Sequence, residues 1–389
     1  MKPLLRGLTL ALLMLGAFVS GYVLRDMESV MAQSGSEFPL LVEAADYIDE
    51  FYVKDKPDGT RLQYALIRSY LAELGDPNTF FIEPAVAASE SDSLAGRYGG
   101  IGVDIQINEE GNYLLFPFED SPAQREGIRE GDILLAVNGM PIELGITMDE
   151  VRQLLRGEIV EGAGVTLRVR TLGDEEEREI FVPFEEILVP SVTWRTLLEA
   201  PDIGYINISR FTSRTPEEFA QGVTELQDAG VKALVLDLRG NPGGLLQESI
   251  DVAGEFFDGG VLSIEERVTG ESTKDDEAGG MVLDLPVVVL VDHRTASASE
   301  IVAGALQARE RGIVIGQQTF GKGSIQSIFS LSDSSSIHVT VAVWYKPDGG
   351  ELDGVGLTPD IPMIPDENQR DVELGEAIRY LQSEVIGQE

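Results

Sequence analysis

The segment PVVVLVDHRTASASE, residues 286–300, runs from an apolar stretch through a polar turn into a helical pattern. The apolar run Val287–Val291 is typical of a strand that is buried on both faces of a sheet. Similar apolar runs alternate with helical segments from residue 190 onward, so we expect an α/β domain around a largely parallel sheet. The expected strands are 203–208, 233–238, 287–291 and 313–315, and the expected helices are 216–229, 245–257 and 300–311.

Ser297 lies where the strand turns into the helix. The free N–H groups at the start of a helix stabilise negative charge that forms beside them, which suits a nucleophilic serine. The same serine also fits a capping box, because Glu300 follows three positions later. The segment alone leaves both interpretations open, and a serine nucleophile also needs a base.

Histidine and lysine are the candidates for that base. The chain has two histidines, His293 and His338, and neither has an obvious partner in the sequence. Lys322 lies between Gly321 and Gly323, which permit close packing of the backbone. A lysine that is neutral at pH 7 needs its pKa lowered by about 3.4 units, at a cost of about 4 to 5 kcal/mol. Burial can supply a shift of that size, although a solvated turn lysine has the same local sequence.

The segment DLRGNPGG, residues 237–244, follows another expected strand. Its paired glycines, Gly243 and Gly244, can direct backbone N–H groups at an oxyanion. A plain turn between a strand and a helix uses the same residues, so this segment also leaves two interpretations open.

Between residues 98 and 184 the pattern changes to short strands, at 101–107 and 165–169, around a helix at 148–156. The loop formed by Gly100, Ile101, Gly102 and Val103 suits a peptide's terminal carboxylate, because its backbone N–H groups converge and the next strand can accept the peptide along its edge. A bare Gly-x-Gly is also a common tight turn. The ordered elements that follow resemble those of the PDZ domains of bacterial peptidases: SPA at 121–123, GI at 127–128, GDIL at 131–134 and VNG at 137–139.

Composition excludes several classes of function. The chain has 29 basic and 67 acidic residues and a net charge of −38, so nucleic acid would be repelled over most of the surface. It has no cysteine, which excludes thiol catalysis and disulfides. With only two histidines, a multi-histidine metal site is not expected.

The N-terminus has the pattern of an export signal. Lys2 and Arg6 precede an uncharged run from Leu8 to Leu24. At about 1.5 Å per residue this run spans roughly 25 Å, slightly less than a hydrocarbon core of about 30 Å. A V-x-A pattern at residues 30–32 is a possible cleavage site, but it lies well past the apolar run. We therefore favour an uncleaved anchor over a cleaved signal.

Three further segments have a clear local pattern. The polar stretch 270–280 predicts a mobile surface loop, and the acidic run 174–179 predicts a solvated hairpin tip. Residues 371–386 predict a C-terminal helix.

Taken together, the ordered motifs resemble those of the C-terminal processing, or tail-specific, serine peptidases. The resemblance covers nearly the whole chain after the signal and rests on GDP at 75–77, the PDZ elements, DLRGNPGG at 237–244, SASE at 297–300, TFGKG at 319–323 and GVGLTPD at 354–360. It implies a crotonase-like α/β peptidase core with an inserted β-rich PDZ domain and a helical N-terminal segment. The expected division is 1–32 signal or anchor, 37–95 helical region, 96–184 PDZ domain, 185–366 peptidase domain and 367–389 C-terminal helix.

By this resemblance Ser297 is the nucleophile, Lys322 the base and Gln326 a support for the lysine. The N–H groups of Ala298 and of Gly243 or Gly244 would then hold the oxyanion. In an ideal strand Lys322 and Gln326 lie about 13 Å apart, so their contact requires a bend at Gly323.

The resemblance also implies partners and location. It requires no metal or organic cofactor, and it implies protein substrates with apolar C-terminal tails, bound at Gly100–Val103. The expected location is the cell membrane, with the catalytic domain outside the cytoplasm, or secretion into the periplasm if the signal is cleaved; oligomers remain possible. Two alternatives stay open: a PDZ-bearing binding protein with an inactive peptidase domain, and an acyl-CoA enzyme. The export signal and the PDZ elements argue against the second.

Overall fold

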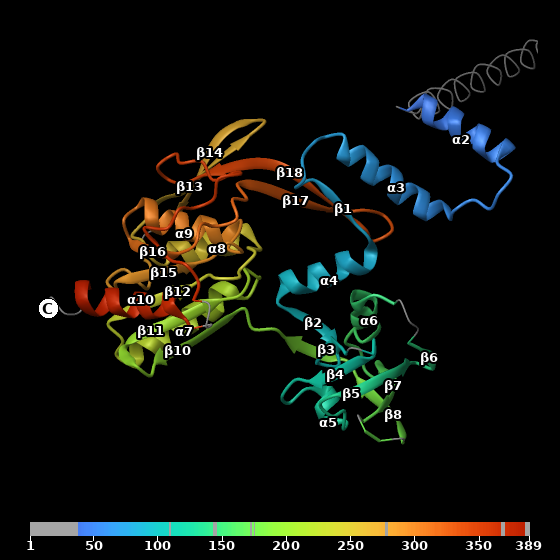
Figure 1. Cartoon of the computed structure of the whole chain (residues 1–389), viewed down its shortest axis with the longest axis horizontal. Coiled ribbons are helices and arrows are strands. Elements are labelled where there is room, and N and C mark those ends of the chain that lie inside the picture. Colours follow the sequence, from blue (N-terminus) through green and yellow to red (C-terminus); the bar gives the residue numbers. More distant parts are fainter. Residues whose placement is uncertain are drawn as a thin grey trace, which may run out of the picture. The chain divides into compact units, whose positions relative to one another are not determined.

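The structure is a computed structural model that describes residues 38–385, except 109, 143–145, 172, 175, 277–278 and 367–369 (Figure 1). The chain divides into two compact units, Met1–Ala65 and Leu66–Glu389. The export segment expected at residues 8–24 lies outside the described residues. Of the helices that the structure describes, none has both the length and the apolar character to cross a membrane.

Helices dominate the N-terminal part of the described chain. Helix α2 spans Pro39–Phe51 and buries none of its residues, and α3 spans Gly59–Ala72 across the boundary between the units. In the second unit, α4 spans Pro84–Ala95 and ends at Gly96, which has a left-handed φ of 64°. The short strand β1, Phe80–Ile82, precedes α4 and pairs with a strand more than 250 residues later in the chain, so sequence patterns alone did not predict it.

The next domain is a sheet with strand order β3-β4-β5-β7-β8, in which β6 pairs with β5. It encloses its own apolar core, which includes Leu115, Val151 and Leu167. Strand β3 forms one edge of the sheet and α6 packs nearby, beginning at the cap residue Thr147. The bounds are β3 Val103–Ile107, β4 Tyr113–Pro117, α5 Pro122–Arg125, β5 Asp132–Val137, β6 Met140–Pro141, α6 Met148–Leu154, β7 Gly164–Arg170 and β8 Glu177–Pro183.

A two-stranded ribbon marks where the chain enters and leaves this domain. Strand β2, Arg97–Gly100, pairs antiparallel with β9, Glu185–Leu188. Strands β7 and β8 form a hairpin, and the acidic run predicted as its tip extends into β8, where Glu177 pairs with Arg170.

The α/β domain is built on a six-stranded sheet with order β10-β11-β12-β15-β16-β19. The pairs from β11 to β19 are parallel, as the apolar strand pattern predicts, and β10 is antiparallel at one edge. The bounds are β10 Val192–Leu197, β11 Ala200–Ile208, β12 Ala233–Asp237, β15 Val287–Val291, β16 Gly312–Gly316 and β19 Ile361–Pro362.

Helices cover both faces of this sheet, which explains why its inner strands β15 and β16 are apolar throughout. Alternate residues of one strand, such as Val287 and Val289, join the core beneath α7, α8 and α9, whereas Val288 and Leu290 face α10 (Figure 1). The helices are α7 Thr215–Asp228, α8 Leu246–Gly254, α9 Ala298–Ala308 and α10 Val372–Tyr380, which continues as the π-helical turn η1, Leu381–Val385.

A second sheet has strand order β1-β18-β13-β14, with β17 also paired to β18. Here the prediction of a loop at residues 270–280 is wrong, because β14 occupies Gly270–Asp276 and pairs with β13. At the end of the sheet path β14 exposes polar side chains to water, so its composition resembles that of a loop. The other bounds are β13 Gly260–Arg267, β17 Ser324–Ser330 and β18 Ser336–Tyr345.

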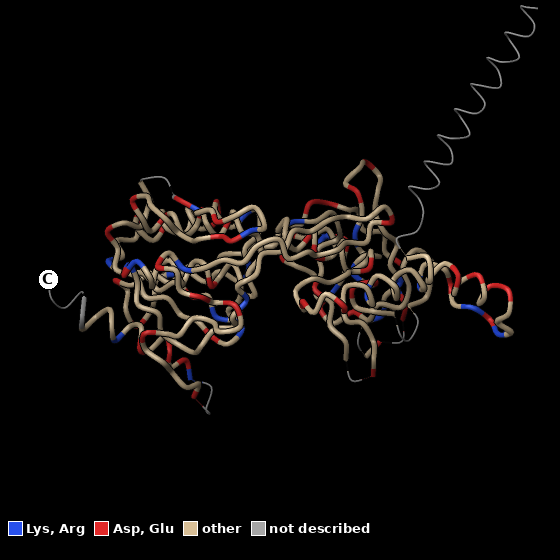
Figure 2. Tube along the Cα trace, turned by 90° about the horizontal axis from the view of Figure 1, so that it is seen from above, with Lys and Arg blue, Asp and Glu red and all other residues tan. Residues whose placement is uncertain are grey.

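Acidic residues are spread along the described chain and outnumber basic ones (Figure 2). This charge distribution repels polyanions and favours solubility.

Candidate active site

The turn after β15 is fixed by Asp292. Its carboxylate accepts hydrogen bonds from the backbone N–H groups of Gly240, Arg294 and Thr295, at 2.9, 3.0 and 3.0 Å. Burial raises the pKa of Asp292, but the hydrogen bonds from Gly240 and Arg294 and the charge of Arg294 outweigh this effect, so the net pKa lies below its usual range. The ends of β12 and β15 are thereby tied together, and each carries a loop toward the same cavity.

Ser297 occupies the N-cap position of α9, and the Glu300 half of the predicted capping box is present, because Glu300 accepts the backbone N–H of Ser297. Its backbone has φ 56° and ψ −119°, a left-handed conformation that is uncommon for a residue with a side chain. A structural cap normally has an extended backbone, so the conformation of Ser297 is unusual for a residue that only caps a helix.

The carboxylate of Glu300 joins Ser297 to the loop that carries Lys322. Glu300 is fully buried, and its Oε2 accepts the backbone N–H of Ser297 at 2.8 Å and that of Lys322 at 2.9 Å. Its Oε1 accepts the N–H of Gly321 at 2.8 Å and the hydroxyl of Thr319. The sequence marked Glu300 only as half of a capping box, because its contacts with residues 319–322 cannot be seen in local spacing.

The glycines beside Lys322 permit close packing, as expected. A Cβ on Gly321 would lie 2.7 Å from the nitrogen of Gly356, and one on Gly323 would lie 2.5 Å from the nitrogen of Asp353. The TFGKG loop therefore packs closely against residues 352–356, where the GVGLTPD segment begins, which explains why it needs glycine at these two positions.

Burial lowers the pKa of Lys322, and this is the largest influence on it. The carboxylates of Glu90 and Asp76 oppose the shift, whereas the guanidinium of Arg210 adds to it. The net pKa lies below the usual lysine range, which is the direction that a general base requires.

A cavity of about 390 Å³ is lined by the predicted catalytic and oxyanion residues other than Gly243. Its lining includes Ser297, Ala298, Gly244, Lys322 and Gln326. Apolar side chains complete much of the wall, and they include Leu94, Leu245, Leu246, Ile301, Ile325 and Trp344.

Gln326 lies near the start of β17, Ser324–Ser330. Lys322 precedes β17, and the pairing of β17 with β18 shifts register between Ile325 and Gln326, so ideal strand spacing does not apply. The Gln326 amide donates to the hydroxyls of Ser324 at 2.8 Å and Thr340 at 3.2 Å. Its contact with Lys322 stays a prediction.

The two histidines differ in position. His293 is exposed on the turn before Ser297. His338 lines the cavity, and its Nε2 lies 3.0 Å from Oε2 of Glu90.

The glycine loop before α8 approaches Ser297 closely. A Cβ on Gly243, which has φ 99°, would lie 2.9 Å from Cβ of Ser297. The Gly243 N–H donates to Oδ1 of Asn241 at 2.9 Å, whereas the N–H groups of Gly244 and Ala298 have no hydrogen-bond partner in the described part of the chain. Asn241 is fully buried, and its carbonyl accepts the N–H of Ala296 at 3.1 Å. It is a positioning residue that the sequence motif included without indicating its role.

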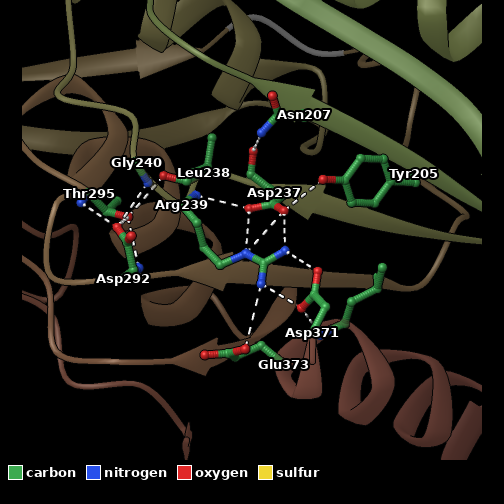
Figure 3. A network of polar contacts seen from close by, with 11 residues as sticks. Tyr205, Asn207, Asp237, Leu238, Arg239, Gly240, Asp292, Thr295, Asp371 and Glu373 are labelled. Carbon is green, nitrogen blue, oxygen red and sulfur yellow. Dashed lines mark hydrogen bonds and ion pairs between the residues drawn. The ribbon is translucent and has the colours of Figure 1, made fainter. Parts of the chain in front are cut away.

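A polar network surrounds Arg239 and Asp237, which directly precede this loop in the chain (Figure 3). Arg239 donates to Oδ2 of Asp237 at 2.6 Å and to both carboxylate oxygens of Asp371, at 2.6 and 2.9 Å. Tyr205 donates its hydroxyl to Asp237 at 2.7 Å. Burial raises the pKa of Asp371. The hydrogen bonds that its carboxylate accepts from Arg239 and from the N–H of Leu374 outweigh this effect, so the net pKa lies below its usual range. The start of α10 is thus tied to the residue that precedes the glycine loop.

A second cavity lies in the smaller domain, between β3 and α6. Its lining includes Ile101, Gly102, Val103, Leu155 and Arg156. Since β3 lies at the sheet edge, its outer backbone groups are available to pair with an added strand.

Comparisons with known proteins agree with this architecture. Residues 202–363 match the profile of Peptidase family S41, and residues 119–170 match that of a PDZ domain. The loop Gly100–Val103 lies outside the matched PDZ segment.

Relatives match over most of their length. The chain is 33% identical to the carboxy-terminal-processing protease of Bartonella bacilliformis, over 92% of this chain and 86% of that protein. It is 34% identical to the chloroplastic C-terminal processing peptidase of Tetradesmus obliquus, over 83% and 73% respectively. The solved structure of the photosystem II D1 C-terminal processing protease is similar with a TM-score of 0.51 and 31% identity, over 90% of this chain and 92% of that one. The chain therefore belongs to peptidase family S41 and is a serine peptidase of the carboxyl-terminal-processing type with a PDZ domain.

Proposed function

We propose that this peptidase cleaves proteins through Ser297 as nucleophile and Lys322 as general base. The observation that carries the proposal is the Glu300 carboxylate, whose Oε2 accepts the backbone N–H groups of Ser297 at 2.8 Å and of Lys322 at 2.9 Å. One buried group thereby fixes the backbones of both residues at the wall of one cavity.

In the proposed reaction, neutral Lys322 takes the proton from Ser297 Oγ as the oxygen attacks a peptide carbonyl. The N–H groups of Ala298 and Gly244 donate to the oxyanion, because they are unpartnered among the described residues and both residues line the cavity. Lys322 then protonates the leaving amine, and water releases the acyl group from Ser297. Gln326 would orient the lysine amine from the same cavity wall.

The cavity beside β3 is the proposed site for the substrate's C-terminal tail. The loop Gly100–Val103 would accept the terminal carboxylate, and the apolar lining from Ile101, Val103 and Leu155 favours an apolar last residue. We also propose that residues 8–24 anchor the protein in the membrane, as their uncharged sequence indicates.

The test is hydrolysis of a protein with an apolar C-terminal tail, followed by mass spectrometry of the products. Wild type, Ser297→Ala, Lys322→Ala and Lys322→Arg are compared after circular dichroism has shown that each is folded. We expect cleavage by wild type alone, because arginine keeps the positive charge but cannot act as a base near neutral pH. Equal cleavage by Ser297→Ala would refute the nucleophile, and equal cleavage by Lys322→Arg would refute the base.

A further inference from the structure

Helix α4 presents different residues to the two domains of the second unit. On one face, Ser89 accepts a hydrogen bond from Gln153 of α6 at 3.2 Å, and Asp92 pairs with Arg156 at 2.5 Å. On another face, Glu90 and Leu94 line the catalytic cavity. Since residues four apart share one face of a helix, this part of α4 belongs to the cavity wall.

The carboxylate of Glu90 is held at that wall. Its Oε2 lies 3.0 Å from Nε2 of His338, whose buried ring stacks on Phe80 with 4.5 Å between ring centroids. The close contact with His338 lowers the pKa of Glu90, and the charges of Arg210 and Lys322 act in the same direction, against the effect of burial. Glu90 is therefore an anion near neutral pH.

Several charged groups act electrostatically on Lys322, and two of them, Glu90 and Arg210, line the same cavity as the lysine. Glu90 comes from α4, Asp76 from the turn before β1, and Arg210 from the loop after β11. His338 of β18 lines the same cavity, and the carboxylate of Glu300 is engaged by backbone N–H groups. Among the charges, Glu90 acts most strongly on the lysine and opposes the effect of burial. The negative charge of Asp76 has the smaller effect, and its oxygens accept hydrogen bonds from Asn78 and Thr79.

We propose that Glu90 is a positioning residue that acts through Lys322, as a counter-ion that retains the proton on Lys322 Nζ. The inference rests on the proposed role of Lys322 as the base. A counter-ion beside a general base lowers the fraction of free amine at a given pH, so the peptidase gains activity only as the pH rises through the pKa of the lysine. The carboxylate thereby sets the lower limit of the pH range in which the peptidase works.

The test is the pH profile of kcat/KM for Glu90→Gln, with a peptide that has an apolar C-terminal end. Removal of the negative charge lowers the pKa of Lys322, so we expect the acidic limb of the profile to move to lower pH by about one unit. For each protein, kcat/KM is expressed as a fraction of its plateau value at high pH. At a pH below the acidic limb, this fraction should be about tenfold higher in the variant than in wild type. The rate at which a small fluorophosphonate labels Ser297 should show the same shift, because that reaction does not require tail binding.

Three variants serve as controls. Glu217→Gln removes the same charge from an exposed position on α7 and should leave the limb in place. Glu90→Asp keeps the charge and should stay closer to wild type than Glu90→Gln does. Glu90→Ala is a second neutral variant, and it should shift the limb in the same direction as Glu90→Gln.

An acidic limb that stays in place in both neutral variants would overturn the proposal. Loss of folded protein in both would assign Glu90 a structural role and would also overturn it. Failure of the proposed function is distinguishable, because Lys322→Arg would then cleave as wild type does. If Lys322→Arg is inactive and the limb does not move, only the role of Glu90 fails.

Discussion

Replacement of Glu300 by glutamine tests how the active site is assembled. The carboxylate accepts hydrogen bonds from the backbone N–H groups of Ser297, Gly321 and Lys322 and from the hydroxyl of Thr319, and it is fully buried. Glutamine keeps one oxygen and replaces the other by an NH₂ group, so two of the four donors would face another donor.

Hydrogen bonds to charged groups are worth about 1.5 to 3 kcal/mol each, so the loss of two predicts an unfolding free energy lower by about 3 to 6 kcal/mol. The backbones of Ser297 and Lys322 would also lose their common acceptor. A displacement of about 1 Å costs on the order of 100-fold in rate, so we expect kcat to fall by at least about that factor at temperatures where the variant stays folded.

Urea denaturation followed by circular dichroism measures the first quantity, and peptide hydrolysis measures the second. Glu265→Gln is the matched control, because Glu265 is also a buried carboxylate but pairs with Arg267 at 3.0 Å on β13. That variant should lose stability while it keeps its kcat. If Glu300→Gln retains both wild-type stability and wild-type kcat, the assignment of Glu300 as the link between the two loops is wrong.

Three further results are expected. Gly243→Ala should lower kcat more than tenfold, because the new Cβ would lie 2.8 Å from the carbonyl oxygen of Ala296. Gly230→Ala is the control, because Gly230 has a similar positive φ but open space around it, and this variant should lose stability alone. Asp371→Asn should lower the unfolding free energy by about 1 kcal/mol at pH 7. Because the folded-state pKa of Asp371 is depressed, the contribution of its charge is full above the unfolded value near 4 and disappears as the pH falls through the folded value. A stability difference that does not shrink as the pH falls below about 4 would contradict the ion pair as its origin. A C-terminally amidated peptide should compete with tail binding more weakly than the free acid in a fluorescence-anisotropy assay; equal competition would exclude recognition of the carboxylate.

The parallel sheet of the α/β domain could be predicted from the sequence because it is buried on both faces. Strand β15, Val287–Val291, is apolar at every position, and both the core under α9 and the core under α10 require this. Strand β14 could not be predicted in this way. Its register with β13 depends on backbone pairing, while its side chains are polar and mostly exposed.

For the catalytic cavity, the sequence predicted residue types but not the contacts between distant segments. Ser297 and Lys322 stood out through their motifs, and the structure places both at one cavity. Glu300 was noticed only as a cap, since its bonds to residues 319–322 cross a large loop. Glu90 gave no signal, because α4 reaches the cavity only through tertiary packing with residues such as His338.

The most direct test of the central claim is to label the folded protein with a fluorophosphonate and to locate the adduct by tandem mass spectrometry. If Ser297 is the nucleophile and Lys322 its base, one adduct should form on Ser297 in wild type, none should form at that position in Ser297→Ala, and labelling should be at least about 100-fold slower in Lys322→Ala. An adduct on a different residue, or labelling of Lys322→Ala at the wild-type rate, would contradict the Ser297–Lys322 mechanism.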